Sequence, residues 1–107
     1  MSGYVLSRDA DADLQNIFSY GYGACGEKQA TAYLYELYET LGRIGANPGI
    51  GRARADLHPL VRGLPHRSHT VFFLPWRGTT LVTRILHGAA DHLKAFEGYD
   101  PPAGMAD

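Results

Sequence analysis

The first half of the chain carries two apolar stripes with helical spacing. The first recurs at intervals of one, three and four residues and consists of Ala10, Leu14, Ile17 and Phe18. Ser7 precedes it as a candidate N-cap, and the glycines in residues 21–23 are expected to end this helix, because glycine costs about 1 kcal/mol in a helix interior. The second stripe follows Gly26 and consists of Ala30, Leu34, Leu37, Leu41 and Ile44. Asn47 and Pro48 favour a helix end there, so the pattern predicts two antiparallel helices joined by a short link.

The second half changes to short runs rich in β-branched and aromatic residues, which are typical of strands. These runs are residues 60–64, 70–74 and 79–86. Residues 75–78 separate the last two runs and predict a hairpin with a four-residue loop. We expect residues 4–6 to add a short strand at an edge of the sheet, and residues 91–96 to form a short terminal helix.

These elements predict an α+β fold, in which an N-terminal αα-hairpin packs on a small antiparallel sheet of three to four strands and a short C-terminal helix follows. A chain of 107 residues suits one domain. We assign residues 1–98 to that domain and residues 99–107 to a C-terminal tail. The chain shows neither a secretory signal pattern nor an apolar run of about 20 residues, so we expect a cytoplasmic protein without membrane contact.

The charge distribution argues against nucleic acid as the main ligand. Ten Lys and Arg against eleven Asp and Glu give a net charge of −1, whereas proteins that bind phosphate backbones carry a basic excess. Six of the eight arginines nevertheless fall within one stretch, and these are Arg52, Arg54, Arg62, Arg67, Arg77 and Arg84. A sheet face with Arg62, Arg67 and Arg84 beside His69 and His87 is a candidate site for phosphates or acidic side chains. The alternative is that these arginines protect exposed strand edges.

The remaining chemical candidates are weak. His66 and His69 are three residues apart, so on one strand they point to opposite faces, and no zinc-binding motif is present. We therefore expect no metal and no cofactor. Cys25 lacks a catalytic signature and suits a tight turn. The tyrosines of the second helix are either a recognition surface or the edge of the core, and these are Tyr33, Tyr35 and Tyr38.

The order of several short motifs resembles the ParE toxins of the RelE/ParE superfamily. The matching segments are residues 4–7 followed by Asp13-Leu14, the Asn-Pro-Gly-Ile-Gly-Arg link at 47–52, the Ser-His-Thr-Val-Phe-Phe strand at 68–73, and Arg-Ile-Leu-His-Gly at 84–88. The resemblance extends over about residues 4–92. It implies the RelE/ParE fold, which agrees with the fold expected from the hydrophobic pattern.

The resemblance also implies a function and partners. ParE toxins are associated with non-enzymatic inhibition of DNA gyrase and are neutralised by a cognate antitoxin, commonly a ribbon-helix-helix protein whose C-terminal segment wraps the toxin. The expected assembly is a toxin–antitoxin hetero-oligomer that reaches DNA only through the antitoxin. Our candidates for antitoxin or target contacts are Arg52, Arg62, Arg67, His69, Phe73, Arg84 and His87.

Two alternatives to gyrase inhibition stay open. RelE relatives cleave mRNA on the ribosome, which requires acid–base groups and cations. Arg84 and His87 are the candidates for that chemistry, although a regular strand would point them to opposite faces unless a bulge intervenes. Ala89 and Ala90 replace a position where the family often has arginine, so an inactive homologue that retains antitoxin binding is the second alternative.

Overall fold

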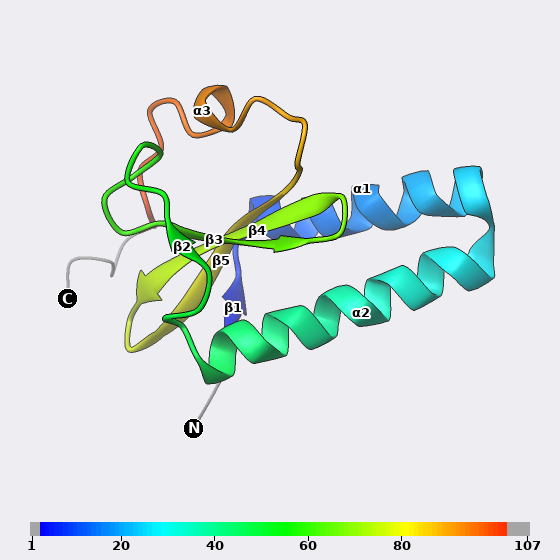
Figure 1. Ribbon diagram of the computed structural model, residues 1–107, viewed down its shortest axis with the longest axis horizontal. Helices are drawn as coiled ribbons and strands as arrows, with labels where there is room; N and C mark the ends of the chain where they lie inside the picture. Colours follow the sequence, from blue (N-terminus) through cyan, green and yellow to red (C-terminus); the bar gives the residue numbers. More distant parts are fainter. Residues whose placement is uncertain (1–2, 103–107) are drawn as a thin grey trace.

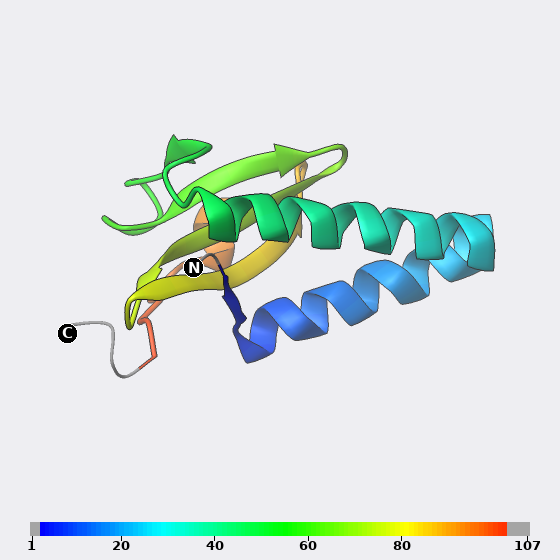
Figure 2. The ribbon, with the colours of Figure 1, turned by 90° about the horizontal axis from the view of Figure 1, so that it is seen from below.

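The computed structural model describes residues 3–102, which form a five-stranded sheet with helices on both faces (Figure 1). In chain order the elements are β1 (Val5–Leu6), α1 (Arg8–Cys25), α2 (Glu27–Ala46), β2 (Arg52–Ala53), β3 (Arg62–His66), β4 (His69–Trp76), β5 (Thr79–His87) and α3 (His92–Ala95). The strand order is β1-β5-β4-β3-β2, with β1 parallel to β5 and the other pairs antiparallel. The α1–α2 hairpin covers one face of the sheet and extends well beyond its end (Figure 2).

The predicted α+β fold, an αα-hairpin on a small sheet with a short terminal helix, is confirmed. The sheet differs from the predicted antiparallel sheet of three to four strands, because it has five strands and β1 runs parallel to β5. The additional strand β2 is only two residues long, so it gives no detectable periodicity in the sequence. The β4–β5 loop is shorter than predicted, since Pro75 and Trp76 pair with β5. Only Arg77 and Gly78 form the turn, with φ of 50° and 74°. Two consecutive positive φ angles match the twist of a tight hairpin.

The prediction that helix α1 ends at residues 21–23 is wrong, because the helix continues to Cys25. A side chain on Gly21 would meet the Cβ of Ala30 at 3.5 Å, so this glycine lies where α1 and α2 approach each other closely. Packing between the helices outweighs the intrinsic cost of glycine. The break falls instead at Gly26, whose φ of 88° is left-handed.

Ser7 attaches the start of α1 to the sheet. Its hydroxyl accepts from the Ala10 amide at 3.0 Å, as predicted for an N-cap, and donates to the Thr83 carbonyl at 2.8 Å. Its own amide donates to the Val82 carbonyl at 3.0 Å. One residue therefore caps the helix and fixes its first turn against β5.

The sheet has an apolar cluster on each face, because successive side chains of a strand point to opposite sides. The cluster under the helices includes Leu14, Leu37, Leu41, Ile44, Val71, Phe73, Val82 and Ile85. The cluster on the other face consists of Val61, Phe72, Leu74, Leu81 and Phe96. Tyr99 packs against the second cluster, and residues 103–107 of the predicted tail 99–107 lie outside the described residues. Between residues 3 and 102, no helix is long and apolar enough to cross a membrane.

The carboxylate of Asp13 connects α1 to an open edge of β5. Strand β1 pairs with β5 only at Leu81 and Val82, so the edge beyond Val82 has no neighbouring strand. There Asp13 accepts from the Ile85 amide at 2.8 Å and from Nε and Nη2 of Arg84 at 2.8 and 3.0 Å. These hydrogen bonds raise the pKa of the Arg84 guanidinium. The contact supplies the acceptor that a buried strand amide needs.

We expect Asp13→Asn to lower the free energy of unfolding by about 2 kcal/mol, because the amide loses the charge and turns an NH2 group towards donors. Urea unfolding followed by circular dichroism measures this change. The matched control is Asp11→Asn, since Asp11 accepts only an exposed hydrogen bond from Gln15; its expected cost is below about 1 kcal/mol. Equal losses in the two variants would contradict the role of Asp13.

Candidate partner-binding site

Three histidines form a row across β3, β4 and β5. His66 pairs with His69, and His69 pairs with His87 in register. The prediction that His66 and His69 point to opposite faces is wrong, because they lie on two strands joined by the two-residue turn Arg67-Ser68. Residues directly opposite each other in an antiparallel pair share a face. The rings of His69 and His87 are 5.6 Å apart between centroids.

Helix α2 contacts this histidine row through two hydroxyl groups. The Tyr33 hydroxyl lies 2.7 Å from Nδ1 of His69, and it donates to the His66 carbonyl at 3.3 Å. The Thr40 hydroxyl lies 2.8 Å from Nδ1 of His66. The row therefore faces the αα-hairpin, and Tyr33 joins the hairpin to both strands of the β3–β4 turn.

Burial disfavours the charged form of two histidines of the row, His66 and His69. It lowers the pKa of His66, with a smaller opposing effect from Glu36. It also lowers the pKa of His69, where positive charge on His87 and then on His66 adds to the effect. The carboxylate of Glu36 binds Nε of Arg67 at 2.7 Å and lies farther, at 3.8 Å, from Nε2 of His66. That Nε2 is buried and has no hydrogen-bond partner among the described residues.

The αα-hairpin extends beyond the end of the sheet (Figure 2), and an apolar groove lies there beside the histidine row. Its volume is about 240 Å³, and it lies between the end of the hairpin and the β3–β4 turn. Its lining includes Ile17, Tyr20, Gly21, Ala30, Tyr33 and His69. Tyr20 is 79% exposed and stands at the rim. Cys25, the last residue of α1, is also exposed there. The groove presents aromatic and aliphatic surface that no described segment of the chain covers.

The sequence-predicted contact residues are not gathered in one place. His69 and His87 lie together in the histidine row, and Arg67 lies in the turn that precedes His69. Phe73 is 1% exposed and belongs to the core under the helices, so its predicted contact with a partner is not supported. Arg52 lies on the edge strand β2, away from the groove.

Two of the arginines predicted as contact residues are bound by acceptors of the chain itself. Arg62 donates to the carbonyls of Gly49, Ile50 and Gly51 at 2.8 to 3.2 Å, so it holds the loop before β2. Arg84 is bound to Asp13. Both guanidinium groups satisfy backbone or carboxylate acceptors that the fold itself supplies.

Arg84 and His87, the candidate acid–base pair of the mRNA-cleavage alternative, are not brought together. A bulge is present in β5, but it lies before Arg84: Val82 and Arg84 pair with consecutive residues of β4, so Thr83 is the extra residue. From Arg84 to His87 the pairing with β4 is regular, and these two side chains point to opposite faces. His87 instead neighbours His69.

The groove itself was not predicted. Ile17 and Ala30 were recognised as apolar helix positions, which is the signal the sequence carries. Tyr20 and Gly21 gave no such signal, because helix α1 was expected to end nearby. Whether a helical stripe is covered by a sheet depends on tertiary placement, which periodicity does not encode.

Comparison with known proteins gives a consistent result. Residues 4–92 match the sequence model of the family described as "ParE toxin of type II toxin-antitoxin system, parDE". The chain is 42% identical over 91 residues to Toxin ParE1 of Mycobacterium tuberculosis, a match that covers 84% of this chain and 93% of the relative. It is 34% identical over 92 residues to Toxin ParE of Escherichia coli, covering 85% and 89%. A solved structure described as "Chromosomal ParDE TA system from P. aeruginosa" shares the fold with a TM-score of 0.72 at 24% identity, covering 81% of this chain and 96% of that one.

The histidine row makes stability depend on pH. Because the folded pKa values of His66 and His69 are lowered, the unfolded chain binds more protons below the ordinary histidine pKa of about 6.5. The contribution of these rings is fully present above that pH and decreases as pH falls through it. We expect NMR titration midpoints for both rings below those of the same rings in urea-unfolded chain. Midpoints at or above the unfolded values would contradict the effect of burial.

Proposed function

We propose that this chain, which belongs to the ParE toxin family of type II toxin–antitoxin systems, is neutralised by a cognate antitoxin and inhibits DNA gyrase by protein binding when it is free. Family membership supports both steps as the expectation for such a toxin. The proposed antitoxin is of the ribbon-helix-helix type. In that arrangement DNA is bound by the antitoxin, and the toxin carries no DNA-binding role of its own.

The observation that carries the antitoxin proposal is the apolar groove at the overhanging end of the αα-hairpin. An amphipathic segment placed there would cover Ile17 and Tyr33 and bury the exposed ring of Tyr20. Recognition of an amphipathic helix by a groove depends on such apolar anchors. Tyrosine at the rim also supplies a hydroxyl that can stay in water, which favours its use in interfaces.

The histidine row suits the same apolar partner. A charged ring at the groove would have to lose its hydration when the partner binds, at a large free-energy cost. Burial lowers the pKa of His69 and so favours its uncharged form, which makes covering this ring with an antitoxin segment less costly. We therefore propose His69 and His87, with Arg67 in the adjacent turn, as antitoxin contacts among the sequence-predicted residues.

The position of Arg84 favours gyrase inhibition over mRNA cleavage. Cleavage of an RNA backbone needs cations near the acid–base groups to stabilise charge on the phosphate. Arg84 is bound to Asp13 on the far side of the strand from His87, and Arg62 is bound to the loop carbonyls. The net charge of −1 also weighs against binding of RNA.

The chain freed from its antitoxin is expected to block supercoiling by purified DNA gyrase at low molar ratio and to leave ribosome-bound mRNA intact. Addition of the antitoxin is expected to restore supercoiling. Both reactions are read on gels, with heat-denatured chain as the control. Codon-periodic mRNA cuts with normal supercoiling would overturn the proposal in favour of an endonuclease. No effect in either assay, with antitoxin binding retained, would identify an inactive homologue.

We expect Tyr20→Ala to weaken antitoxin binding by about 30-fold, because an aromatic anchor at the groove contributes about 2 kcal/mol. The matched control is Tyr35→Ala, which removes a tyrosine of the same hairpin that is 66% exposed and does not line the groove. Isothermal titration calorimetry with the purified antitoxin measures both. Equal affinities of the two variants would place the antitoxin elsewhere.

A further inference from the structure

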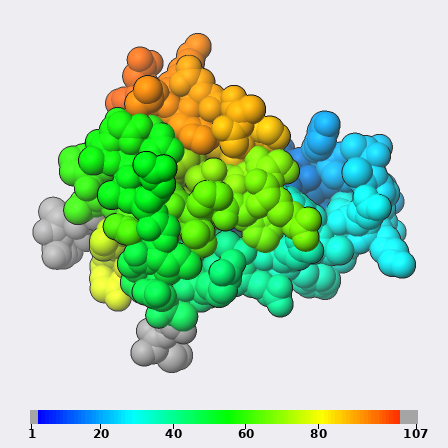
Figure 3. All heavy atoms as spheres, in the orientation of Figure 1, coloured from blue at the N-terminus to red at the C-terminus, as the bar shows by residue number. Residues whose placement is uncertain are grey.

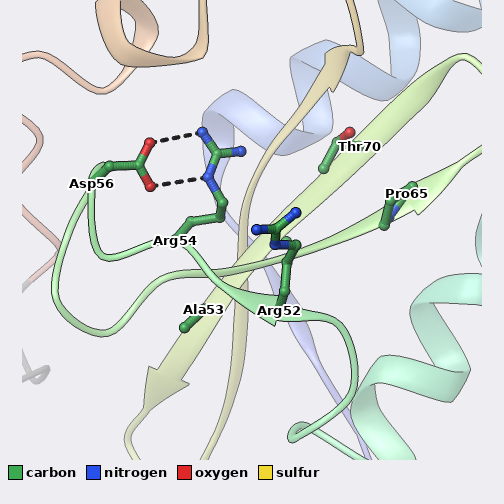
Figure 4. Close-up of a pocket in the computed structure, with 7 residues that line it drawn as sticks. Arg52, Ala53, Arg54, Asp56, Pro65 and Thr70 are labelled. Atoms are coloured by element: carbon green, nitrogen blue, oxygen red, sulfur yellow. Dashed lines mark hydrogen bonds and ion pairs between the residues drawn. The ribbon is translucent and has the colours of Figure 1, made fainter.

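A second hollow lies on the face of the sheet opposite the αα-hairpin. It has a volume of about 470 Å³ and is bordered by β2, β3 and β4 (Figure 4). Arg54, Gly63 and Thr70 are among its lining residues. In the space-filling view, residues 50–60, the β3–β4 hairpin and residues 88–98 come together over this side of the sheet (Figure 3). The hollow is therefore separate from the groove proposed for the antitoxin.

The absence of a side chain at Gly63 opens the floor of this hollow. Gly63 pairs with Arg52 on one side and with Phe72 on the other, so all three share a face of the sheet. A Cβ on Gly63 would lie 3.2 Å from the Phe72 ring and 3.4 Å from the methyl group of Thr70. Any larger residue would fill the space between strand β4 and the two arginines Arg52, in β2, and Arg54, just after it.

One arginine of the hollow is already held in place. Arg54 donates from Nε and Nη2 to the two oxygens of Asp56, at 3.0 and 2.9 Å. Its guanidinium carbon also lies 5.6 Å from the centre of the Phe72 ring. Contacts with a carboxylate and an aromatic ring together fix the orientation of the guanidinium. Arg54 therefore presents a guanidinium group of fixed orientation at one side of the hollow, and Asp56 is its counterion.

The guanidinium of the other arginine has no direct partner in the described part of the chain. The Arg52 side chain makes no hydrogen bond or ion pair with any residue that the structure describes, and its charge acts on Asp56 only at longer range. Its guanidinium projects between Arg54 on one side and Thr70 and Pro65 on the other (Figure 4). In this respect Arg52 differs from Arg62, whose donors are used by carbonyl groups of the fold.

We infer that this hollow receives one carboxylate side chain, an aspartate or glutamate of a partner protein, on the guanidinium of Arg52. Two arginines and Asp56 give the hollow a formal charge of +1, which one carboxylate balances. A phosphate dianion would exceed that charge. Arginine binds a carboxylate through two parallel hydrogen bonds, and the hydroxyl of Thr70 offers a further donor in the same hollow.

The test is an NMR titration of the full chain with the blocked peptide acetyl-Gly-Glu-Gly-amide, whose only charge is the side-chain carboxylate. We expect shifts at the Arg52 Nε–H and at the amides of Gly63 and Thr70. The control peptide acetyl-Gly-Gln-Gly-amide, at the same ionic strength, is expected to leave them unchanged. Equal shifts with both peptides, or none with either, would overturn the inference. Stronger shifts with inorganic phosphate would replace the carboxylate with a phosphate ligand.

Two variants separate this site from general charge effects. Arg52→Gln is expected to weaken binding of the glutamate peptide by about ten-fold. Arg77→Gln removes the same charge from the exposed β4–β5 turn and is expected to change affinity less than about two-fold. Gly63→Ala fills the hollow without a charge change and is expected to weaken binding if its amide spectrum shows that it folds. Equal losses in the two arginine variants would overturn the assignment.

Discussion

The fold depends on how the αα-hairpin is fastened to β5, and Asp13 makes the central contact. Strand β1 covers only two residues of β5, so the amides beyond them require another acceptor. Asp13 supplies it to Ile85 and simultaneously binds Arg84. Because Asp13 lies at 13% and Arg84 at 27% side-chain exposure, this ion pair is partly shielded from water and is screened less by salt than a surface pair. This contact sets the position of α1 on the sheet, and therefore the position of the whole α1–α2 hairpin.

That attachment has a consequence for the histidine row and the groove. The bulge at Thr83 precedes Arg84, so Ile85 and His87 point towards the helices while Arg84 reaches Asp13 around the open strand edge. The same offset places His87 beside His69. Arg84, which belongs to a motif that resembles ParE toxins, therefore has a structural role. Because its side chain is bound to Asp13, it is not available to pair with His87.

The parts that the sequence predicts correctly are those with a repeating pattern. The long apolar stripe of helix α2 and the residues Asn47 and Pro48 predict both the helix and its end correctly. The N-cap at Ser7 is predicted by its side-chain chemistry alone. The strand β2, the two-residue turns and the row of His66 with His69 were missed, because each depends on a register that spacing along the chain does not reveal. The contact between Asp13 and Arg84 joins positions 71 residues apart and carries no local signal.

The two faces of the sheet present different chemistry, and each difference has its own physical cause. On the helix side, burial by the hairpin lowers the pKa of His66 and His69 and leaves an apolar, neutral surface at its end. On the other side, Gly63 and the short edge strand leave space that the described residues do not fill, and the Arg52 guanidinium has no hydrogen bond or ion pair among them. A partner that contacts both faces must therefore combine an apolar segment with an acidic side chain. Such a combination gives specificity that neither contact supplies alone, because the apolar contact provides affinity and the charge pair fixes the register.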